Sequence, residues 1–278
     1  MTTETTSERD PDFSALLKAT QGHPERAFGV ELEERGDIVT GRTRAGVLPL
    51  GADGKLAAGA LGVLVDDTLG FALVGAARRP SWSVSVEIAL DFVGPLTGAS
   101  GLHATGLATD LDGTAGFAQG EVRDDQGRML VSARQHGRYV PLPTPDRMAP
   151  RLERLLTGSD VLDLLGATVS TEAAATTLTI DDPAPWLNNL ETLHGGIGIC
   201  AAEAAATCAT LDGAEALRTT SISAAFGRPM RGDGAFAFVA KTLQAGRTLR
   251  VVEVVGSAQG RACIFARIIR QASAGVAR

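Results

Sequence analysis

Residues 188–196 read NNLETLHGG and open an apolar stretch that carries Glu203. This segment decides the fold because residues 51–59, which read GADGKLAAG, open a similar apolar stretch that carries Asp66. In both places the acid lies seven residues after the last glycine of the segment. The shared spacing indicates that the chain contains one structural unit twice, with the copy at 188–196 better preserved.

The repetition continues downstream of both apolar stretches. Residues 81–95 read SWSVSVEIALDFVGP and residues 219–229 read TTSISAAFGRP, and both alternate apolar and polar residues as a strand does. Counting back from the final prolines aligns Ser85 with Thr219. Further strand-like runs follow at 101–109, 117–123 and 128–140 in the first half, and at 234–243, 248–256 and 261–270 in the second.

Each copy is predicted to contain one long helix, over 57–73 and 196–209. Apolar residues occur on nearly every side of both helices, so each helix must be buried over most of its surface. A single antiparallel sheet around the helix would provide that burial. We expect a short helix and one strand before each long helix, and the leucines of 151–165 indicate the short helix of the second copy.

The boundary between the copies is predicted at 141–150. Four prolines in these ten residues cannot continue a strand ladder or a helix. The polar and acidic start of the chain is predicted to be a disordered tail. The predicted organisation is therefore a tail over 1–12, a first copy over 13–140, a linker over 141–150 and a second copy over 151–272.

The composition narrows the class of protein. The 278 residues are 44% hydrophobic and 21% charged, with a formal net charge of −6, which leaves room for two cores and offers no basic surface for nucleic acid. The apolar runs contain charged residues or are too short for the roughly 20 residues that span a bilayer. The polar, acidic start of the sequence leads us to expect no signal peptide. We expect a cytoplasmic protein without membrane contacts.

The three cysteines lack the spacing of a disulfide framework or a zinc site, so no metal is predicted.

The start of the second long helix is suited to binding a developing oxyanion. The first turn of a helix has backbone N–H groups without partners and lies at the positive end of the helix dipole. Gly195 and Gly196 would let a carbonyl group approach these N–H groups, because glycine has no Cβ. The side-chain amide of Asn188 could hold the carbonyl group or an attacking water. Such donors stabilise a transition state by a few kcal/mol.

Each acid lies too far along its own helix to act at that helix's start, since seven residues correspond to about 10 Å of rise. If the two helices pack antiparallel, Asp66 faces 188–196 and Glu203 faces 51–59. The latter segment has glycine and alanine where the former has asparagine and histidine, so we expect one working site, with Asp66, and one decayed site. Asp67 is the alternative acid, but it departs from the shared spacing and points about 100° away on the helix.

The pattern at 188–203 resembles that of the hot-dog fold acyl-CoA thioesterases of the phenylacetyl-CoA thioesterase and thioesterase-superfamily type, in which Asn-x-x-Gly-x-x-His-Gly-Gly is followed by an acid seven residues on. The resemblance extends over nearly the whole chain as two tandem copies. It implies an α+β fold of two hot-dog repeats, each a long central helix wrapped by an antiparallel sheet, packed as an intrachain pseudo-dimer. Glu191 departs from the pattern, since it stands where the family has glycine.

The resemblance also implies roles for individual residues. These are carbonyl binding by Asn188 and Gly195, general-base or nucleophilic action by Asp66, placement of water by Ser85, and support of the loop by His194 and Gly196. A possible second site would consist of Glu203, Thr219 and Gly59. Coenzyme A has phosphates that need cations, for which the candidates are Arg78, Arg79, Arg228, Arg231 and Arg247.

The predicted function is hydrolysis of acyl-CoA thioesters without a metal or other cofactor. Two other functions stay open. One is hydration or dehydration of acyl thioesters by His194 with Asp66, and the other is binding of acyl-CoA without catalysis. Acyl-CoA is the expected ligand, a carrier-protein thioester is an open alternative, and a homo-oligomer of the double unit stays open.

Overall fold

The computed structural model describes residues 21–143, 156–172, 175–211 and 217–272. The predicted tail over 1–12, and the predicted linker from residue 144 on, lie outside them.

The first half forms α2 (His23–Ala27), β1 (Glu31–Arg35), β2 (Ile38–Arg44), η1 (Ala45–Val47), η2 (Ala58–Ala60), α3 (Leu61–Ala76), β3 (Trp82–Phe92), β4 (Gly101–Asp110), β5 (Ala115–Asp124) and β6 (Met129–Val140). The second half forms α4 (Val161–Leu165), β7 (Ala167–Glu172), β8 (Ala175–Ile180), η4 (Ala184–Trp186), α5 (Gly195–Cys208), β9 (Leu217–Phe226), β10 (Phe236–Ala245), β11 (Leu249–Ala258) and β12 (Arg261–Ala272).

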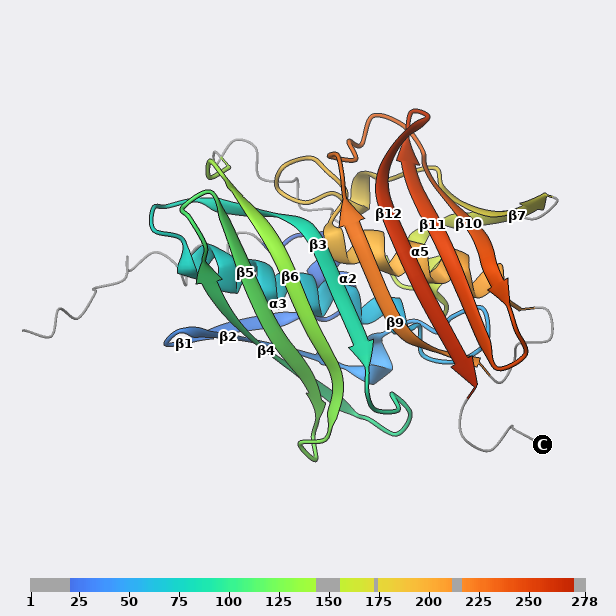
Figure 1. Cartoon of the computed structure of the whole chain (residues 1–278), viewed down its shortest axis with the longest axis horizontal. Coiled ribbons are helices and arrows are strands. Elements are labelled where there is room, and N and C mark those ends of the chain that lie inside the picture. Colours follow the sequence, from blue (N-terminus) through green and yellow to red (C-terminus); the bar gives the residue numbers. More distant parts are fainter. Residues whose placement is uncertain (1–20, 144–155, 173–174, 212–216, 273–278) are drawn as a thin grey trace, which may run out of the picture.

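These strands belong to one twelve-stranded sheet with the order β1-β2-β4-β5-β6-β3-β9-β12-β11-β10-β8-β7 (Figure 1). Every neighbouring pair is antiparallel. At the centre, residues 87–91 of β3 pair with residues 221–225 of β9, and the strand order outward from this pair is equivalent in both directions. The prediction of an α+β fold with a large antiparallel sheet is confirmed.

The helices α3 and α5 lie against one face of this sheet (Figure 1). Twelve of the 16 residues of α3 and twelve of the 14 residues of α5 are buried, which explains why apolar residues occur on nearly every side. The helices touch through their backbones near their starts. A Cβ on Gly62 would lie 2.8 Å from the carbonyl oxygen of Gly196, and one on Gly196 would lie 2.4 Å from Cα of Val63. This close approach therefore requires glycine on both helices.

The two helix starts run antiparallel along this contact. Gly59 lies against Glu203, and Asp66 lies against Gly196, so residue numbers rise along one helix as they fall along the other. Each acid consequently reaches the beginning of the opposite helix.

The stretch Ala58–Ala76, which combines η2 and α3, is long and apolar enough to cross a membrane by length and composition alone. The stretch contains two acids, Asp66 and Asp67, which a membrane span would have to bury in lipid. In the fold, 83% of its most apolar window is buried inside the protein. Both aspartates contact residues of the other half. The stretch is thus the core helix of the first half.

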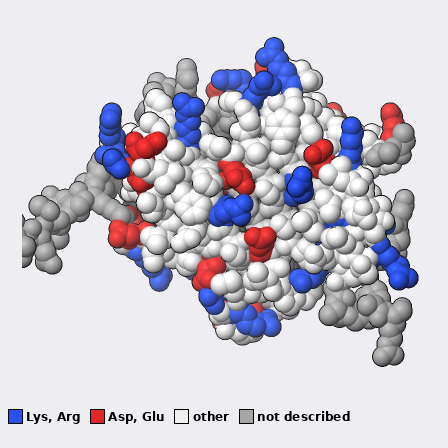
Figure 2. All heavy atoms as spheres, in the orientation of Figure 1, with Lys and Arg blue, Asp and Glu red and all other residues white. Residues whose placement is uncertain are grey.

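The face of the sheet opposite the helices is open (Figures 1 and 2). Basic and acidic side chains are interspersed on it, as in the ion pair between Arg134 and Glu87. The face seen in Figure 2 therefore lacks the continuous basic surface that nucleic acid binding requires.

Two predictions of local structure are wrong. Two strands precede each long helix where one is predicted. In the first half they form a hairpin that turns at Gly36, whose φ of 64° suits glycine. Of the helix predicted over 151–165, residues 151–155 lie outside the described residues. Within 156–165 only Val161–Leu165 (α4) is helical, because α4 begins after Asp160, whose carboxylate accepts hydrogen bonds from the N–H groups of Leu162 and Asp163.

Candidate active site

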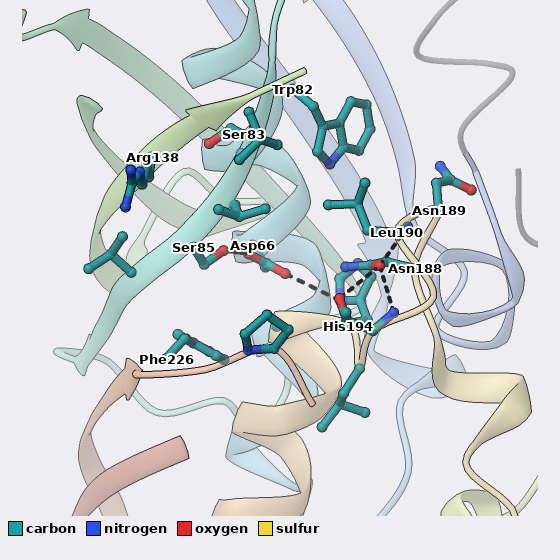
Figure 3. A pocket seen from close by; sticks show the side chains of 18 of the residues that line it. Asp66, Trp82, Ser83, Ser85, Arg138, Asn188, Asn189, Leu190, His194 and Phe226 are labelled. Atoms are coloured by element: carbon teal, nitrogen blue, oxygen red, sulfur yellow. Dashed lines mark hydrogen bonds and ion pairs between the residues drawn. The ribbon is translucent and has the colours of Figure 1, made fainter. Parts of the chain in front are cut away.

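A cavity of about 920 Å³ lies between the two halves of the chain (Figure 3). Its walls come from α3, β3 and β6 of the first half, and from the loop before α5 and the turn after β9 of the second. The structure therefore brings together predicted site residues from both halves. Those that line the cavity are Asp66, Ser85, Asn188, His194 and Gly195.

Asp66 projects from α3 toward the start of α5 and is 9% exposed (Figure 3). Its Oδ1 accepts a hydrogen bond of 2.8 Å from the hydroxyl of Ser85. Its Oδ2 accepts one of 2.9 Å from the backbone N–H of Gly196. The carboxylate is thus held by one donor from each half, at the positive end of the α5 dipole.

Gly195 is the first residue of α5 and has no room for a side chain. A Cβ there would lie 2.7 Å from Oδ2 of Asp66. Within the described part of the chain, the Gly195 N–H makes no hydrogen bond, as is usual in the first turn of a helix. Glycine at this position therefore lets the carboxylate approach and leaves one N–H group free for a ligand.

Asn188 organises the loop before α5. Its side-chain oxygen accepts hydrogen bonds from the N–H of Leu190 at 2.9 Å, and from the N–H and hydroxyl of Thr192 at 3.3 and 3.1 Å. The oxygen is used inside the loop, so the amide NH₂ is the part of Asn188 that is left to face a substrate. Glu191 has a φ of 58°, in the left-handed region where glycine is unstrained.

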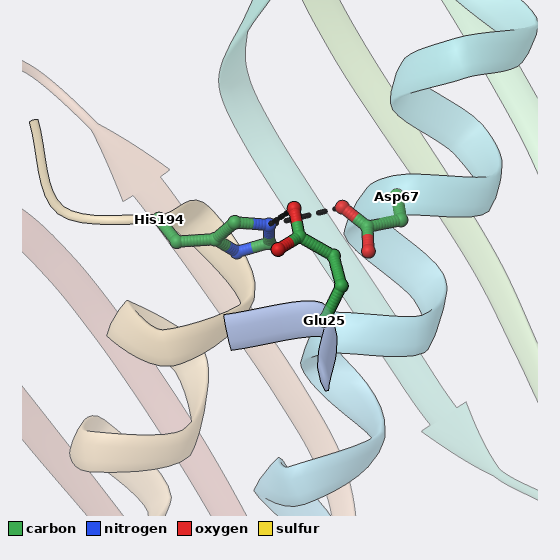
Figure 4. Close-up of side chains that lie close together, drawn as sticks. All are labelled: Glu25, Asp67 and His194. Carbon is green, nitrogen blue, oxygen red and sulfur yellow. Dashed lines mark hydrogen bonds and ion pairs between the residues drawn. The ribbon is translucent and has the colours of Figure 1, made fainter. Parts of the chain in front are cut away.

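His194 caps α5 from its N-terminal side. Its Nδ1 accepts a hydrogen bond of 3.1 Å from the N–H of Gly196, which assigns the proton of the neutral ring to Nε2. Nε2 lies 2.9 Å from Oδ1 of Asp67 and 3.6 Å from Oε1 of Glu25 (Figure 4). Burial alone lowers the pKa of His194, but the surrounding carboxylates outweigh it and raise this pKa well above its ordinary value.

Glu25, Asp67 and His194 form a buried cluster beside the cavity (Figure 4). Burial, and next the charge of Glu25, raise the pKa of Asp67 to about 7. One ligand-type atom from each residue lies within 4.8 Å of the others, a spacing that would suit a metal ion. The same residues also contact one another, with 2.9 Å between Nε2 of His194 and Oδ1 of Asp67. The three side chains therefore form a buried cluster that can share protons.

Gln135, on β6, belongs to the site although it is not among the predicted residues. Its Nε2 donates a hydrogen bond of 2.9 Å to the oxygen of Ser85 and lies 3.5 Å from Oδ1 of Asp66. Because Ser85 accepts from Gln135, its own proton is directed at Asp66. The available signal was a polar residue between Ala133 and Gly137 in the inward-facing row of this strand.

The cavity has cationic side chains at its margin. Two of the five arginines proposed for coenzyme A, Arg228 and Arg231, line it in the turn after β9. Arg138, which is not among the predicted residues, lines it as well. The other three, which follow α3 or lie in the turn between β10 and β11, do not line it: Arg78, Arg79 and Arg247.

Glu203 meets the corresponding groups at the start of α3. Its Oε1 accepts hydrogen bonds from the hydroxyls of Thr219 at 2.7 Å and Thr207 at 3.0 Å, and its Oε2 lies 3.5 Å from the N–H of Gly59. Glu203 is 3% exposed and does not line the cavity. The structure thus brings the residues of the possible second site together, but encloses their acid.

Arg270 is buried near this second acid. It pairs with Thr219 across β9 and β12, as Gly137 pairs with Ser85 across β3 and β6. The Arg270 side chain is 2% exposed, and its guanidinium forms an ion pair of 2.5 Å with Asp53 of the first half. A large cation therefore occupies a position that is held by glycine in the other half.

No protein-family model matches the sequence, and no curated protein is similar to it in sequence. Solved structures do share its fold. The acyl-CoA thioesterase II TesB2 from Mycobacterium marinum is 12% identical, with a TM-score of 0.57 over 92% of this chain and 98% of its own. The tesB protein from Mycobacterium avium subs paratuberculosis is 10% identical, with a TM-score of 0.60 over 90% and 98%. The 12:0-ACP thioesterase from Umbellularia californica is 11% identical, with a TM-score of 0.59 over 90% and 98%. The chain therefore has the fold of these thioesterases.

Proposed function

We propose that this protein hydrolyses acyl-CoA thioesters in the cavity between its two halves. The observation that carries the proposal is the position of Asp66, held between the hydroxyl of Ser85 and the N–H of Gly196 in the cavity wall. A carboxylate, a fixed hydroxyl and a free N–H at a helix start are groups that suit acyl transfer to water. Structures of the same fold are named as acyl-CoA and acyl-ACP thioesterases, which supports the proposal.

In the proposed reaction, the thioester carbonyl oxygen lies at the start of α5, near the free N–H of Gly195 and the amide NH₂ of Asn188. Asp66 takes a proton from a water that Ser85 orients, while the water oxygen attacks the carbonyl carbon. Collapse of the tetrahedral oxyanion breaks the C–S bond, and the proton on Asp66 passes to the departing thiolate. The products are a carboxylic acid and a thiol.

Direct attack by Asp66 is the alternative first step. It would form an anhydride and release the thiolate, and water would then hydrolyse the anhydride. A single turnover in ¹⁸O-labelled water tests for direct attack. Label in the Asp66 side chain would establish direct attack, whereas label only in the released acid would show that water attacks the acyl carbon, of the thioester or of the anhydride.

We assign the two halves as hot-dog repeats that form an intrachain pseudo-dimer, over 13–140 and 151–272. The equivalent strand order on both sides of the β3–β9 pair and the antiparallel contact of α3 with α5 support this assignment.

Of the two acids, we assign activity to Asp66 alone, because Glu203 is enclosed and faces a loop without asparagine or histidine.

Hydration of an unsaturated acyl thioester is less well supported by the contacts of His194. That reaction would need a ring nitrogen of His194 to exchange a proton with the substrate. Nδ1 accepts from Gly196 and Nε2 donates to Asp67, so both nitrogens are engaged. The same contacts suit a histidine that fixes the loop before α5.

Release of free thiol from a panel of acyl-CoAs tests the proposal, with wild type beside Asp66→Asn and with Glu203→Gln as the matched control. Hydrolysis that is lost in Asp66→Asn and kept in Glu203→Gln is the expected result. Loss in Glu203→Gln alone would reverse the assignment of the two acids. Hydration of crotonyl-CoA, or binding without turnover, would contradict thioester hydrolysis.

A further inference from the structure

The cavity extends beyond Asp66 along the side of α3, into a region that the proposed chemistry does not use. Gly70, Phe71 and Val74 form its wall on α3. From Asp66 to Val74 the helix rises by about 12 Å. Trp82 stands at the far side of this arm, where its ring makes an edge-to-face contact with Phe71 at a centroid distance of 5.6 Å (Figure 3). The arm is therefore an apolar groove that begins at the reactive carboxylate.

Gly70 lies on α3 but differs from the glycines at which the two helices meet. A Cβ on Gly59, Gly62 or Gly196 would lie less than 3.0 Å from an atom of the opposite helix. The nearest atom to a Cβ on Gly70 is Nε2 of Gln135, at an ordinary contact distance of 3.7 Å. Packing between the helices therefore does not require glycine at position 70, although glycine inside a helix is destabilising relative to alanine. What Gly70 leaves open is the floor of the groove.

The second half shows what a side chain does at the corresponding position, four residues after the acid. Thr207 occupies this position, is 2% exposed, and donates a hydrogen bond of 3.0 Å from its hydroxyl to Glu203. The acid of that half is enclosed, whereas Asp66 borders a cavity. In the second half a side chain thus fills the space beside this turn of the helix, whereas Gly70 leaves the corresponding space open beyond Asp66.

We propose that the acyl chain of the substrate lies along α3 across Gly70, with its end against Phe71 and Trp82, and that the glycine admits chains of medium length such as octanoyl. This inference rests on the proposed thioester hydrolysis. Trp82 and Phe226 lie on opposite sides of Asp66 (Figure 3). Arg228 follows Phe226 in the cavity wall, so the phosphates of coenzyme A and the apolar chain fit opposite arms.

The test compares kcat/KM for acetyl-CoA and octanoyl-CoA in wild type and Gly70→Leu. The leucine side chain would occupy the groove, so hydrolysis of octanoyl-CoA should fall by about tenfold or more. Hydrolysis of acetyl-CoA should stay within about threefold of wild type, because a two-carbon acyl group does not reach the groove. Gly75→Leu, in the same helix but not in the cavity wall, is the matched control and should preserve the wild-type ratio.

Binding of non-hydrolysable thioethers keeps the two proposals separable. Wild type should bind S-octyl-CoA about tenfold or more tightly than S-ethyl-CoA, and Gly70→Leu should remove this difference. If wild type shows this difference but hydrolyses no acyl-CoA, the proposed reaction fails and the acyl groove stands. The groove is refuted if wild type binds both thioethers equally, if folded Gly70→Leu loses both activities alike, or if it cleaves octanoyl-CoA like wild type.

Discussion

Oδ2 of Asp66 lies 2.9 Å from the backbone nitrogen of Gly196, although 130 residues separate the two in the sequence. The first half supplies the carboxylate and the second supplies the helix start, so neither half contains both groups. Their distance is fixed by the close backbone contact between α3 and α5. The geometry of the site therefore depends on the same glycines that pack the two helices together.

Ser85→Ala should lower kcat by about 100-fold with little change in KM, because it removes the hydroxyl that orients the Asp66 carboxylate and the water. Ser83→Ala is the control. Ser83 lies on the same strand and in the same cavity wall, but its hydroxyl makes no hydrogen bond within the described part of the chain. Steady-state kinetics with one acyl-CoA decides the point, and equal losses in the two variants would contradict this role for Ser85.

Arg228→Ala combined with Arg231→Ala should raise KM for acyl-CoA by about tenfold and leave kcat close to wild type, because phosphate binding is the same in ground and transition states. The difference should shrink as salt is added, since screening weakens contacts between exposed charges. Arg247→Ala, which removes an arginine outside the cavity wall, should leave KM unchanged. A fall in kcat alone would argue against a role in phosphate binding.

The stability of the protein should fall as the pH rises from about 4 to about 7 through the ionisation of Asp67. Burial raises the pKa of this acid from 3.8 to about 7, so over this range the folded protein keeps a proton that the unfolded chain has released. His194, whose pKa is also raised, adds a change of the same sign above 6.5. Asp67→Asn should therefore gain free energy of unfolding relative to wild type as the pH rises.

Urea unfolding at several pH values between about 5 and 8 measures this effect. Asp112→Asn is the control, because Asp112 is an acid whose pKa is lowered by hydrogen bonds from the hydroxyl and N–H of Thr114. Asp112 is ionised in both folded and unfolded chains over this range, so its replacement should leave the pH dependence unchanged. Parallel curves for wild type and Asp67→Asn would show that Asp67 does not titrate in this way.

Arg270→Ala should destabilise the protein by about 3–5 kcal/mol, because it leaves the carboxylate of Asp53 without its ion-pair partner in a buried place. Arg42→Ala removes an arginine from an exposed ion pair with Glu31 and should cost about 1 kcal/mol or less. Denaturant unfolding compares the two variants. Similar losses would mean that the Arg270 pair is not isolated from water.

Glu191→Gly should stabilise the protein by up to about 1 kcal/mol, because glycine adopts the left-handed conformation at φ 58° without strain. Gln259→Gly tests the same change at φ 51°, in the turn between β11 and β12 and away from the cavity. A similar gain at both positions is expected in thermal unfolding. A loss at Glu191 alone would show that the side chain contributes contacts that outweigh the strain.

The long helices and most strands could be predicted because their signals are local. The alternation in residues 81–95 corresponds to β3, and the apolar stretch after 188–196 corresponds to α5. The meeting of Asp66 with the start of α5 could also be anticipated, since equal spacing of the acids in two helices allows each to reach the other's start. Periodicity and spacing therefore account for the centre of the site.

The remaining groups depend on long-range register, which spacing does not encode. Gln135 reaches Ser85 only because β6 pairs with β3 in one register, and Glu25 reaches His194 from α2, which is far from residues 188–196 in the sequence. The arginines could be chosen only after the chain path was known, because solvated cations carry no periodic signal. Arg138 and Arg247 are both exposed, and only the fold shows that Arg138 lines the cavity while Arg247 does not.

The buried Arg270 illustrates how a single chain with two similar halves can acquire different substitutions in each half. In an assembly of two identical polypeptides, one codon change alters both symmetry-related positions, so a bulky cation beside one acid would appear beside the other as well. A single polypeptide that contains both halves is free of this constraint. In this chain the second half has a buried ion pair with the first half, while Asp66 of the first half borders the cavity. Under the proposed function, one half would thus provide the reacting carboxylate and the other an ion pair that stabilises the contact between the halves.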